Sequence, residues 1–203
     1  MVTPKTCAYK NKMEPLVFLD TETTGLEPGY HEIIEICAAK LPHKIASTIE
    51  YPERQIMYYL TLPLHKERID LKAALINGFN MDNWLARGAV ELHEVIEPIA
   101  RFMDGCTIVG FNPWFDLRFI IASTPSDIDL KFNYHTIDLC SMAYPLKVAG
   151  KIPGVSAKHI CKFFEIDYSR AHRACEDVDL SIDCYRLLLN YYENLGQDQL
   201  RTQ

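Results

Sequence analysis

The sequence has no apolar run close to the ~20 residues that a membrane-spanning helix needs. Its start, MVTPKTCAYKNKMEP, also lacks the apolar core of a secretory signal. These absences predict a soluble, cytoplasmic protein with no membrane partner. CxxC pairs are missing too, although the chain contains seven cysteines. An odd number of cysteines without such pairs argues against a zinc site or a complete disulfide framework, and favours buried free thiols in a reducing compartment.

The chain carries fewer positive than negative charges. The chain has 21 lysines and arginines against 27 aspartates and glutamates, which gives a formal net charge of −6. Nonspecific binding to nucleic acid depends on lysine and arginine, so this balance disfavours a phosphate-rich partner. Clustered carboxylates that hold divalent cations would reverse this expectation, because the bound ions supply local positive charge. Charge alone therefore does not decide the partner.

The composition is that of one ordinary globular domain. Hydrophobic residues make up 48% of the 203 residues and charged residues 24%. No internal repeat, low-complexity tract or linker divides the chain. We place a single domain at residues 15–195, after a polar leader at 1–14 and before a short tail at 196–203.

Apolar patterns along the chain predict an α/β fold. Three consecutive strand patterns, at residues 15–23, 32–41 and 56–63, predict an antiparallel meander. Helical patterns then alternate with short strands. Helices are predicted at 70–79, 89–105, 113–123, 156–166 and 175–196, a strand at 106–112, and a strand followed by a helix within 134–146. This order of elements gives a mixed sheet flanked by helices.

The segment FLDTETTGL, residues 18–26, places two carboxylates at the end of the first apolar strand. Side chains two residues apart in a strand share a face, so Asp20 and Glu22 should lie only a few ångströms apart. Two solvated acids at a strand end are one explanation, and a pair that binds a divalent cation is the other. The apolar run before them favours the metal site, because it makes an exposed edge less natural.

Two later segments carry further acids and a histidine. Asp116 starts a helix after an apolar strand, where the helix dipole alone also favours an acid. Asp177 lies beside Val178, at the edge of the last helix's apolar stripe. His172 precedes Asp177 by five residues, which is about 140° on a continuous helix. Joint action therefore requires His172 to lie in the preceding loop, and an ordinary surface histidine is the alternative.

Taken together and in this order, these segments resemble the three motifs of the DEDDh group of 3′→5′ exonucleases. FLDTETTGL is similar to the first motif, VGFNPWFDLRFI to the second and AHRACEDVDLS to the third, with the H-x-x-x-x-D spacing of that group. LINGFN and TIDLCSMAYPL extend the resemblance over residues 16–189. It implies a ribonuclease-H-like mixed sheet, with an antiparallel meander plus parallel strands. It also implies an exonuclease that releases nucleoside 5′-monophosphates from the 3′ ends of DNA or RNA.

The resemblance implies a role for each motif residue. Two Mg²⁺ or Mn²⁺ ions would be held by Asp20, Glu22, Asp116 and Asp177, with Asp20 bridging the ions. His172 would be the general base, since a free imidazole titrates near pH ~6.5 and can accept a proton from water. The terminal nucleotide would contact Thr23, Gly25 and Leu26. Weaker candidates for stacking or sugar contacts are Phe79, Asn112 and Phe115, and core packing is the alternative for both phenylalanines.

The chain departs from many relatives near these motifs. Phe111 and Pro113 flank Asn112 where a histidine and a small residue are common, and Arg173 follows His172 where glycine is frequent. These departures concern substrate handling, and Arg173 could contact a phosphate. The expected partners are single-stranded DNA or RNA 3′ ends, with a polymerase or replication protein as a further option. The short tail favours a stand-alone enzyme or a small accessory subunit.

A catalytically silent protein on the same fold is the alternative function. Such a protein would bind nucleic acid or act as a scaffold. Loss of activity is usually accompanied by loss of a catalytic residue, and all five motif residues are present. The sequence therefore favours an active enzyme.

Overall fold

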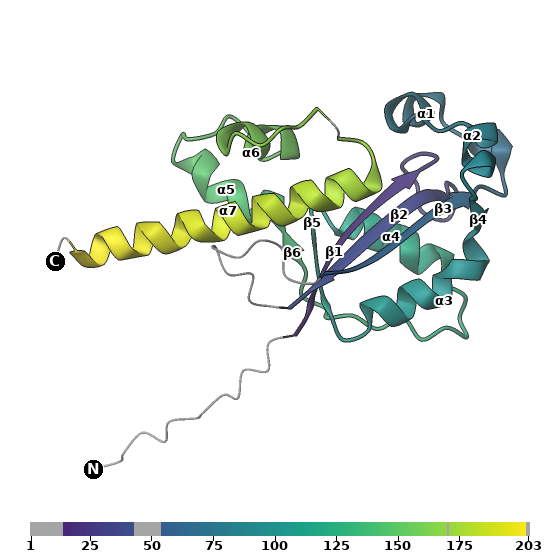
Figure 1. Cartoon of the computed structure of the whole chain (residues 1–203), viewed down its shortest axis with the longest axis horizontal. Helices are drawn as coiled ribbons and strands as arrows, with labels where there is room; N and C mark the ends of the chain where they lie inside the picture. The colour runs from purple at the N-terminus through teal and green to yellow at the C-terminus, as the bar shows by residue number, and fades with distance from the viewer. Residues whose placement is uncertain (1–13, 43–53, 170, 202–203) are drawn as a thin grey trace, which may run out of the picture.

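The computed structural model describes residues 14–42, 54–169 and 171–201, with side chains described to residue 195. Within these residues a six-stranded sheet of order β4-β3-β2-β1-β5-β6 lies between helices (Figure 1). The strands are β1 (Leu16–Thr23), β2 (Ile33–Leu41), β3 (Gln55–Leu62), β4 (Val90–Glu91), β5 (Thr107–Gly110) and β6 (Ile137–Asp138). The helices are the 3₁₀ helix η1 (Lys66–Arg68), α1 (Leu71–Asn77), α2 (Met81–Ala86), α3 (Leu92–Met103), α4 (Trp114–Ser123), α5 (Leu139–Val148), α6 (Ala157–Phe163) and α7 (Ala174–Arg201).

The strand pairing confirms the predicted mixed sheet. β1 pairs with β2 and β2 with β3 in antiparallel register, which is the predicted meander. β1 also pairs with β5, β5 with β6 and β3 with β4, all in parallel. β1 is therefore a central strand, bonded on both sides.

Alternate side chains of β1 enter two separate cores. Leu16 and Phe18 pack under α5, α6 and α7, whereas Val17 and Leu19 pack against α3 and α4. Strand alternation then directs Asp20 to the α7 side of the sheet. The end of β1 can therefore present polar side chains to both helical layers.

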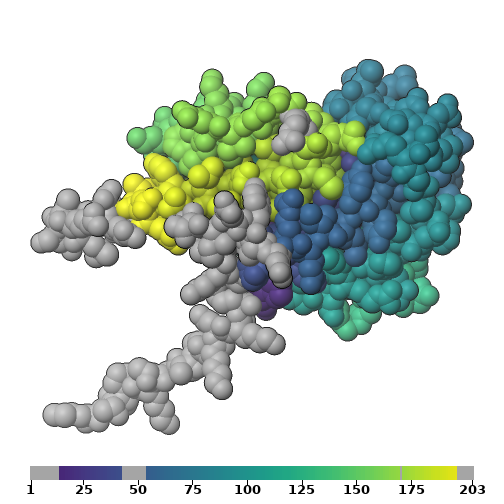
Figure 2. Space-filling view, in the orientation of Figure 1, coloured from purple at the N-terminus to yellow at the C-terminus, as the bar shows by residue number. Residues whose placement is uncertain are grey.

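The long helix α7 crosses one face of the sheet. Its apolar residues Val178, Ile182 and Tyr185 are buried, as the amphipathic pattern predicts. Figure 2 shows the helix along the surface of this face, beside the segment that contains β3. Arg54, just before β3, forms an ion pair with Asp179 of α7. The first turn of α7 lies near the end of β1 (Figure 1).

Three elements differ from the sequence prediction, and one of them is the unpredicted 3₁₀ helix η1. The single helix predicted at 89–105 is a strand, β4, followed by α3. A capping box between Glu91 and Glu94 starts α3 one residue after β4, and Val90 pairs with Thr61. Helix α2 was not predicted. Its start is capped by Asn80, whose side chain accepts a hydrogen bond from the amide of Asn83 at 3.0 Å.

The six cysteines in the described ranges are free thiols, four of them buried, and Cys7 lies outside those ranges. This agrees with the prediction of buried thiols, while the reducing compartment and the cytoplasmic location stay predictions. None of the described helices is both long and apolar enough to cross a membrane. The domain boundaries also stay predictions: residues 1–13 lie outside the described ranges, and the α7 backbone continues to Arg201.

Candidate active site

The two carboxylates of the first motif lie on β1 as predicted. Asp20 is opposite Cys37 and Glu22 opposite Glu35 in the pairing with β2. Both are half-buried. Burial and then the charges of Asp116 and Asp177 raise the pKa of Asp20 well above its usual range. Burial and the nearby charges of Asp177 and Glu35 raise the pKa of Glu22 to about 8.

Asp116 joins the site from the other helical layer. It lies in the first turn of α4 and is only 4% exposed. Its Oδ1 accepts hydrogen bonds from the amide of Thr21 at 2.8 Å and from the Thr21 hydroxyl at 2.7 Å. Burial raises the pKa of Asp116 to about 7, although these two hydrogen bonds oppose the rise. Thr21, on the opposite face of β1 from Asp20, therefore ties the second motif to the first.

His172 lies in the loop before α7, as joint action with Asp177 requires. The amides of His172 and Arg173 donate hydrogen bonds to Oδ2 of Asp177, at 2.8 and 3.2 Å. His172 has a φ of 75°, a left-handed conformation that is uncommon for a residue other than glycine. Its side chain is exposed. Burial raises the pKa of Asp177, while the hydrogen bond from the His172 amide opposes the rise.

Three of the five motif residues form a potential metal-binding group. Glu22, His172 and Asp177 offer ligand atoms that all lie within 4.8 Å of one another. Besides burial, the charge of Asp116 raises the pKa of both Asp20 and Glu22, and the charges of Glu22 and Asp177 raise that of Asp20 as well. In the parts of the chain that the structure describes, none of the four acids pairs with a lysine or arginine. This donor set fits divalent cations, which would neutralise it.

The predicted substrate contacts around Thr23 form a tight turn at the end of β1. The Thr23 hydroxyl donates a hydrogen bond to the carbonyl of Gly25 at 2.6 Å. A Cβ at Gly25 would lie 2.2 Å from Cδ2 of His31, so the packed histidine ring accounts for the glycine. Leu26 is 73% exposed beside this turn. Thr23 and Gly25 are buried, so Leu26 is the exposed member of the three, and the contact with a nucleotide stays a prediction.

The three weaker substrate candidates have different surroundings. Phe79 is half-buried, with its ring 5.1 Å from that of Trp84 in an edge-to-face contact. Phe115 packs on the core under α3 and α4, against Phe119. Asn112 is exposed and has a φ of 52°. Its backbone amide donates a hydrogen bond to Oδ1 of Asp138. Packing explains both phenylalanines, and their roles in binding stay predictions.

The sequence analysis missed residues that support the site. Thr21 lies between the two acids of the first motif. Strand alternation predicts that its side chain points to the opposite face of the sheet, where α4 lies. Asn77, at the end of α1, donates a side-chain hydrogen bond to the carbonyl of Thr23 at 3.1 Å. Glu35 was not singled out, although an acid in the apolar run IIEICAA is unusual. It is 1% exposed and lies across from Glu22.

The fold is that of the ribonuclease-H-like nucleases, as the resemblance implied. The family model described as Exonuclease, RNase_T, matches residues 17–185, and the chain belongs to this exonuclease family.

Curated relatives agree with this family. The DNA polymerase III PolC-type protein of Thermotoga petrophila is 26% identical over 196 residues, which are 95% of this chain and 13% of the relative. The 3′-5′ exonuclease DinG of Staphylococcus saprophyticus is 27% identical and covers 90% of this chain and 19% of the relative. The DNA polymerase III subunit epsilon of Rickettsia conorii is 27% identical, with coverages of 83% and 71%. The chain thus spans a small part of the PolC-type proteins.

Solved structures share the fold. The zinc-bound complex of E. coli ExoI with single-stranded DNA has a TM-score of 0.71 and 21% identity, and covers 94% of this chain and 43% of that chain. E. coli exonuclease I with a dT13 oligonucleotide has a TM-score of 0.67 and 21% identity, with coverages of 91% and 43%. At this identity the likeness establishes the common fold.

Proposed function

We propose that this chain is a divalent-metal-dependent 3′→5′ exonuclease that hydrolyses terminal phosphodiester bonds and releases nucleoside 5′-monophosphates. The observation that carries this proposal is the group of four carboxylates at the end of β1. Their pKa values are raised, first by burial, and none has a lysine or arginine partner among the described residues. So much clustered negative charge is stable at neutral pH when divalent cations bind it.

The oxygen-rich donor set suits Mg²⁺ or Mn²⁺. Asp20, Glu22 and Asp177 would hold the ions at the end of β1. Asp116 would support the second ion from α4, where Thr21 fixes its carboxylate. When bound, two such ions stabilise the attacking and leaving oxygens of an in-line displacement at phosphorus.

His172 has the position of a general base. Its ring lies at the exposed rim of the site, within 4.8 Å of ligand atoms of Glu22 and Asp177. A water molecule that attacks phosphorus at this site can therefore give its proton to the imidazole. The Asp177 carboxylate accepts hydrogen bonds from the loop that carries His172, so metal ligand and base are held together.

The proposed substrate is the 3′ end of single-stranded DNA. The turn from Thr23 to Leu26 lies directly beyond the two acids of β1 and would surround the last sugar. The names of the polymerase III relatives and the DNA complexes of exonuclease I favour DNA over RNA. They also favour a replication protein as a partner.

A digestion panel tests this proposal. Single-stranded DNA, duplex DNA and RNA of one sequence, labelled at the 5′ end, are incubated with Mg²⁺, Mn²⁺ or EDTA. We expect single-stranded DNA to shorten from its 3′ end one nucleotide at a time, and a 3′-phosphate to slow the reaction strongly. The Asp20→Asn variant should be inactive on all three substrates. Efficient cleavage of circular single-stranded DNA, or full activity in EDTA, would contradict the proposal.

A further inference from the structure

Glu35 is a buried acid next to the candidate active site that has its own partners. It is 1% exposed on β2, opposite Glu22. Its Oε1 accepts a hydrogen bond from the Tyr58 hydroxyl at 2.8 Å. Its Oε2 lies 3.4 Å from Nε of Arg173. A buried carboxylate requires a hydrogen-bond donor or a positive charge beside it. The guanidinium of Arg173 therefore lies against the sheet, next to Glu35.

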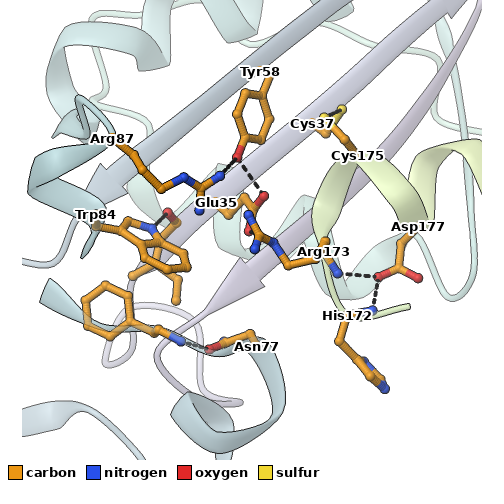
Figure 3. Close-up of polar contacts among 12 residues, drawn as sticks. Glu35, Cys37, Tyr58, Asn77, Trp84, Arg87, His172, Arg173, Cys175 and Asp177 are labelled. Carbon is orange, nitrogen blue, oxygen red and sulfur yellow. Dashed lines mark hydrogen bonds and ion pairs between the residues drawn. The ribbon is translucent and has the colours of Figure 1, made fainter. Parts of the chain in front are cut away.

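Arg173 also lies against an aromatic ring. Its guanidinium carbon is 5.8 Å from the ring centre of Trp84, which is fully buried and donates its indole hydrogen to the carbonyl of Ile34 at 2.7 Å. Arg87 stacks on the same ring at 5.3 Å and donates to the Tyr58 hydroxyl at 3.0 Å. Figure 3 shows Arg173 reaching from the start of α7 toward Glu35 and Trp84. Arg173 is therefore anchored by one buried acid and one fixed ring.

The anchoring of Arg173 affects the residue directly before it, His172. His172 has a left-handed backbone conformation, which persists only where surrounding contacts impose it. Among the described residues, no side chain forms a hydrogen bond with its imidazole, and the ring of Tyr168 is 6.4 Å away. The direction of the imidazole thus follows from the backbone. Asp177 accepts hydrogen bonds from the amides of both His172 and Arg173, and the Arg173 side chain ties the same segment to Glu35 on the sheet.

We propose that Arg173, anchored on Glu35 and Trp84, is the positioning residue that keeps the His172 imidazole facing Glu22 and Asp177. This inference rests on the proposed function. Without the anchor, residue 172 can leave its left-handed conformation and turn the imidazole away from the carboxylates. Arg173 then acts on the proton-transfer step through His172, without touching the substrate.

A double-mutant cycle separates this role from phosphate binding and from general stabilisation. The kcat and KM for a single-stranded DNA oligonucleotide are measured at saturating Mg²⁺ for wild type, Arg173→Met, His172→Ala and the double variant. We expect Arg173→Met to lower kcat about 10- to 100-fold with an unchanged KM, in the range of lost supporting contacts. In the His172→Ala background the same change should cost less than about twofold.

The matched control is Arg87→Met. Arg87 stacks on the same tryptophan and touches the same tyrosine, but is not adjacent to His172. Its loss should lower the melting temperature as Arg173→Met does, with kcat close to wild type. In metal-free protein, the NMR signal of the His172 ring should shift or broaden in Arg173→Met and remain unchanged in Arg87→Met.

An equal loss of kcat in both backgrounds, or a higher KM in Arg173→Met, would show that Arg173 acts on the substrate independently of His172. Unchanged kcat would also overturn the proposal. If Arg173→Met fails to fold because Glu35 is left buried without a cation, Arg173→Met is combined with Glu35→Gln, which removes the charge along with the anchor, and is tested in the same cycle and judged by the same outcomes. An inactive wild type, by contrast, would refute the proposed function.

Discussion

Two groups of buried charge lie side by side on the α7 face of the sheet, and they are built in opposite ways. At the end of β1, Asp20, Glu22 and Asp177 lie together without an ion pair from lysine or arginine in the described residues, and burial raises each pKa. One strand away, the carboxylate of Glu35 has the guanidinium of Arg173 and the hydroxyl of Tyr58.

This difference distinguishes a group of acids that binds a cation from an acid that supports the position of neighbouring residues. An acid that the chain compensates itself is complete without a ligand, and its removal should change stability or position. Acids that the chain leaves uncompensated are costly until a cation arrives, so their removal should change metal binding and catalysis. The following changes test whether the two groups respond in these two ways.

The largest effect is expected from removal of the metal or of Asp20, the carboxylate that the resemblance places between the two ions. EDTA or Asp20→Asn should lower 3′ hydrolysis by about 10³-fold or more, since bound metal supplies several kcal/mol of transition-state stabilisation and 1.36 kcal/mol is tenfold. The fold should remain, because the substitution also removes repulsion. Rates on labelled single-stranded DNA and circular dichroism spectra check both expectations. Near-normal turnover in folded Asp20→Asn would remove Asp20 from the site.

His172 and Asp177 should differ although they share one motif. His172→Ala should keep its affinity for Mn²⁺ and lose about 10²- to 10⁴-fold in rate, the range for a positioned general base. Asp177→Ala should instead weaken Mn²⁺ binding. Calorimetric titration with Mn²⁺ and single-turnover rates distinguish the two. Equal affinity loss in both variants would make His172 a ligand.

The uncompensated group should also make stability depend on pH in metal-free protein. In the folded chain the pKa of Glu22 is about 8 and that of Asp116 about 7, against ~4.3 and ~3.9 for free side chains. Between these limits the folded state binds more protons than the unfolded state, so the free energy of unfolding falls as pH rises from about 4 to 8. At 1.36 kcal/mol per pKa unit the two shifts set an upper limit of about 9 kcal/mol, and solvent screening of the half-buried Glu22 lowers it, so we expect a loss of several kcal/mol.

Urea unfolding at pH 5 and pH 8, in EDTA or in Mg²⁺, measures this dependence. Added Mg²⁺ should restore stability at pH 8, and Glu22→Gln should flatten the profile. Stability that rises with pH in EDTA would contradict the assignment of these carboxyls as an uncompensated group.

The sequence was sufficient to predict that the motif residues lie together, because its signals are local; their catalytic roles stay predictions. Strand alternation placed Asp20 with Glu22, and the helical angle required a loop position for His172. The compensated group depends on contacts between distant segments: Glu35 meets Arg173 only when β2 and the start of α7 pack together. Helix α2, which supplies Trp84, was missed as well, so neither support of Arg173 could be predicted. Gly25 was singled out for a nucleotide contact, which stays a prediction, and the ring of His31 gives a packing reason for the glycine that spacing cannot show.

The smallest effects are expected from two substitutions that each remove one buried hydroxyl group. Thr21→Val removes a hydroxyl that donates to Asp116 at 2.7 Å, and Tyr58→Phe removes one that donates to Glu35 at 2.8 Å. Each should lower the free energy of unfolding by about 1–2 kcal/mol, the range for the loss of one buried hydrogen bond.

The two variants should differ in catalysis, because Asp116 is one of the four carboxylates of the candidate active site and Glu35 is not. Thr21→Val should shift the Mg²⁺ dependence of the rate to higher concentration by about tenfold, as for other supports of a metal ligand. Tyr58→Phe should leave that dependence within about twofold of wild type, since Arg173 still pairs with Glu35. Rates measured across a Mg²⁺ titration decide between them. A similar shift in both variants would mean that Glu35 belongs to the metal site, and that the two groups of charge act as one.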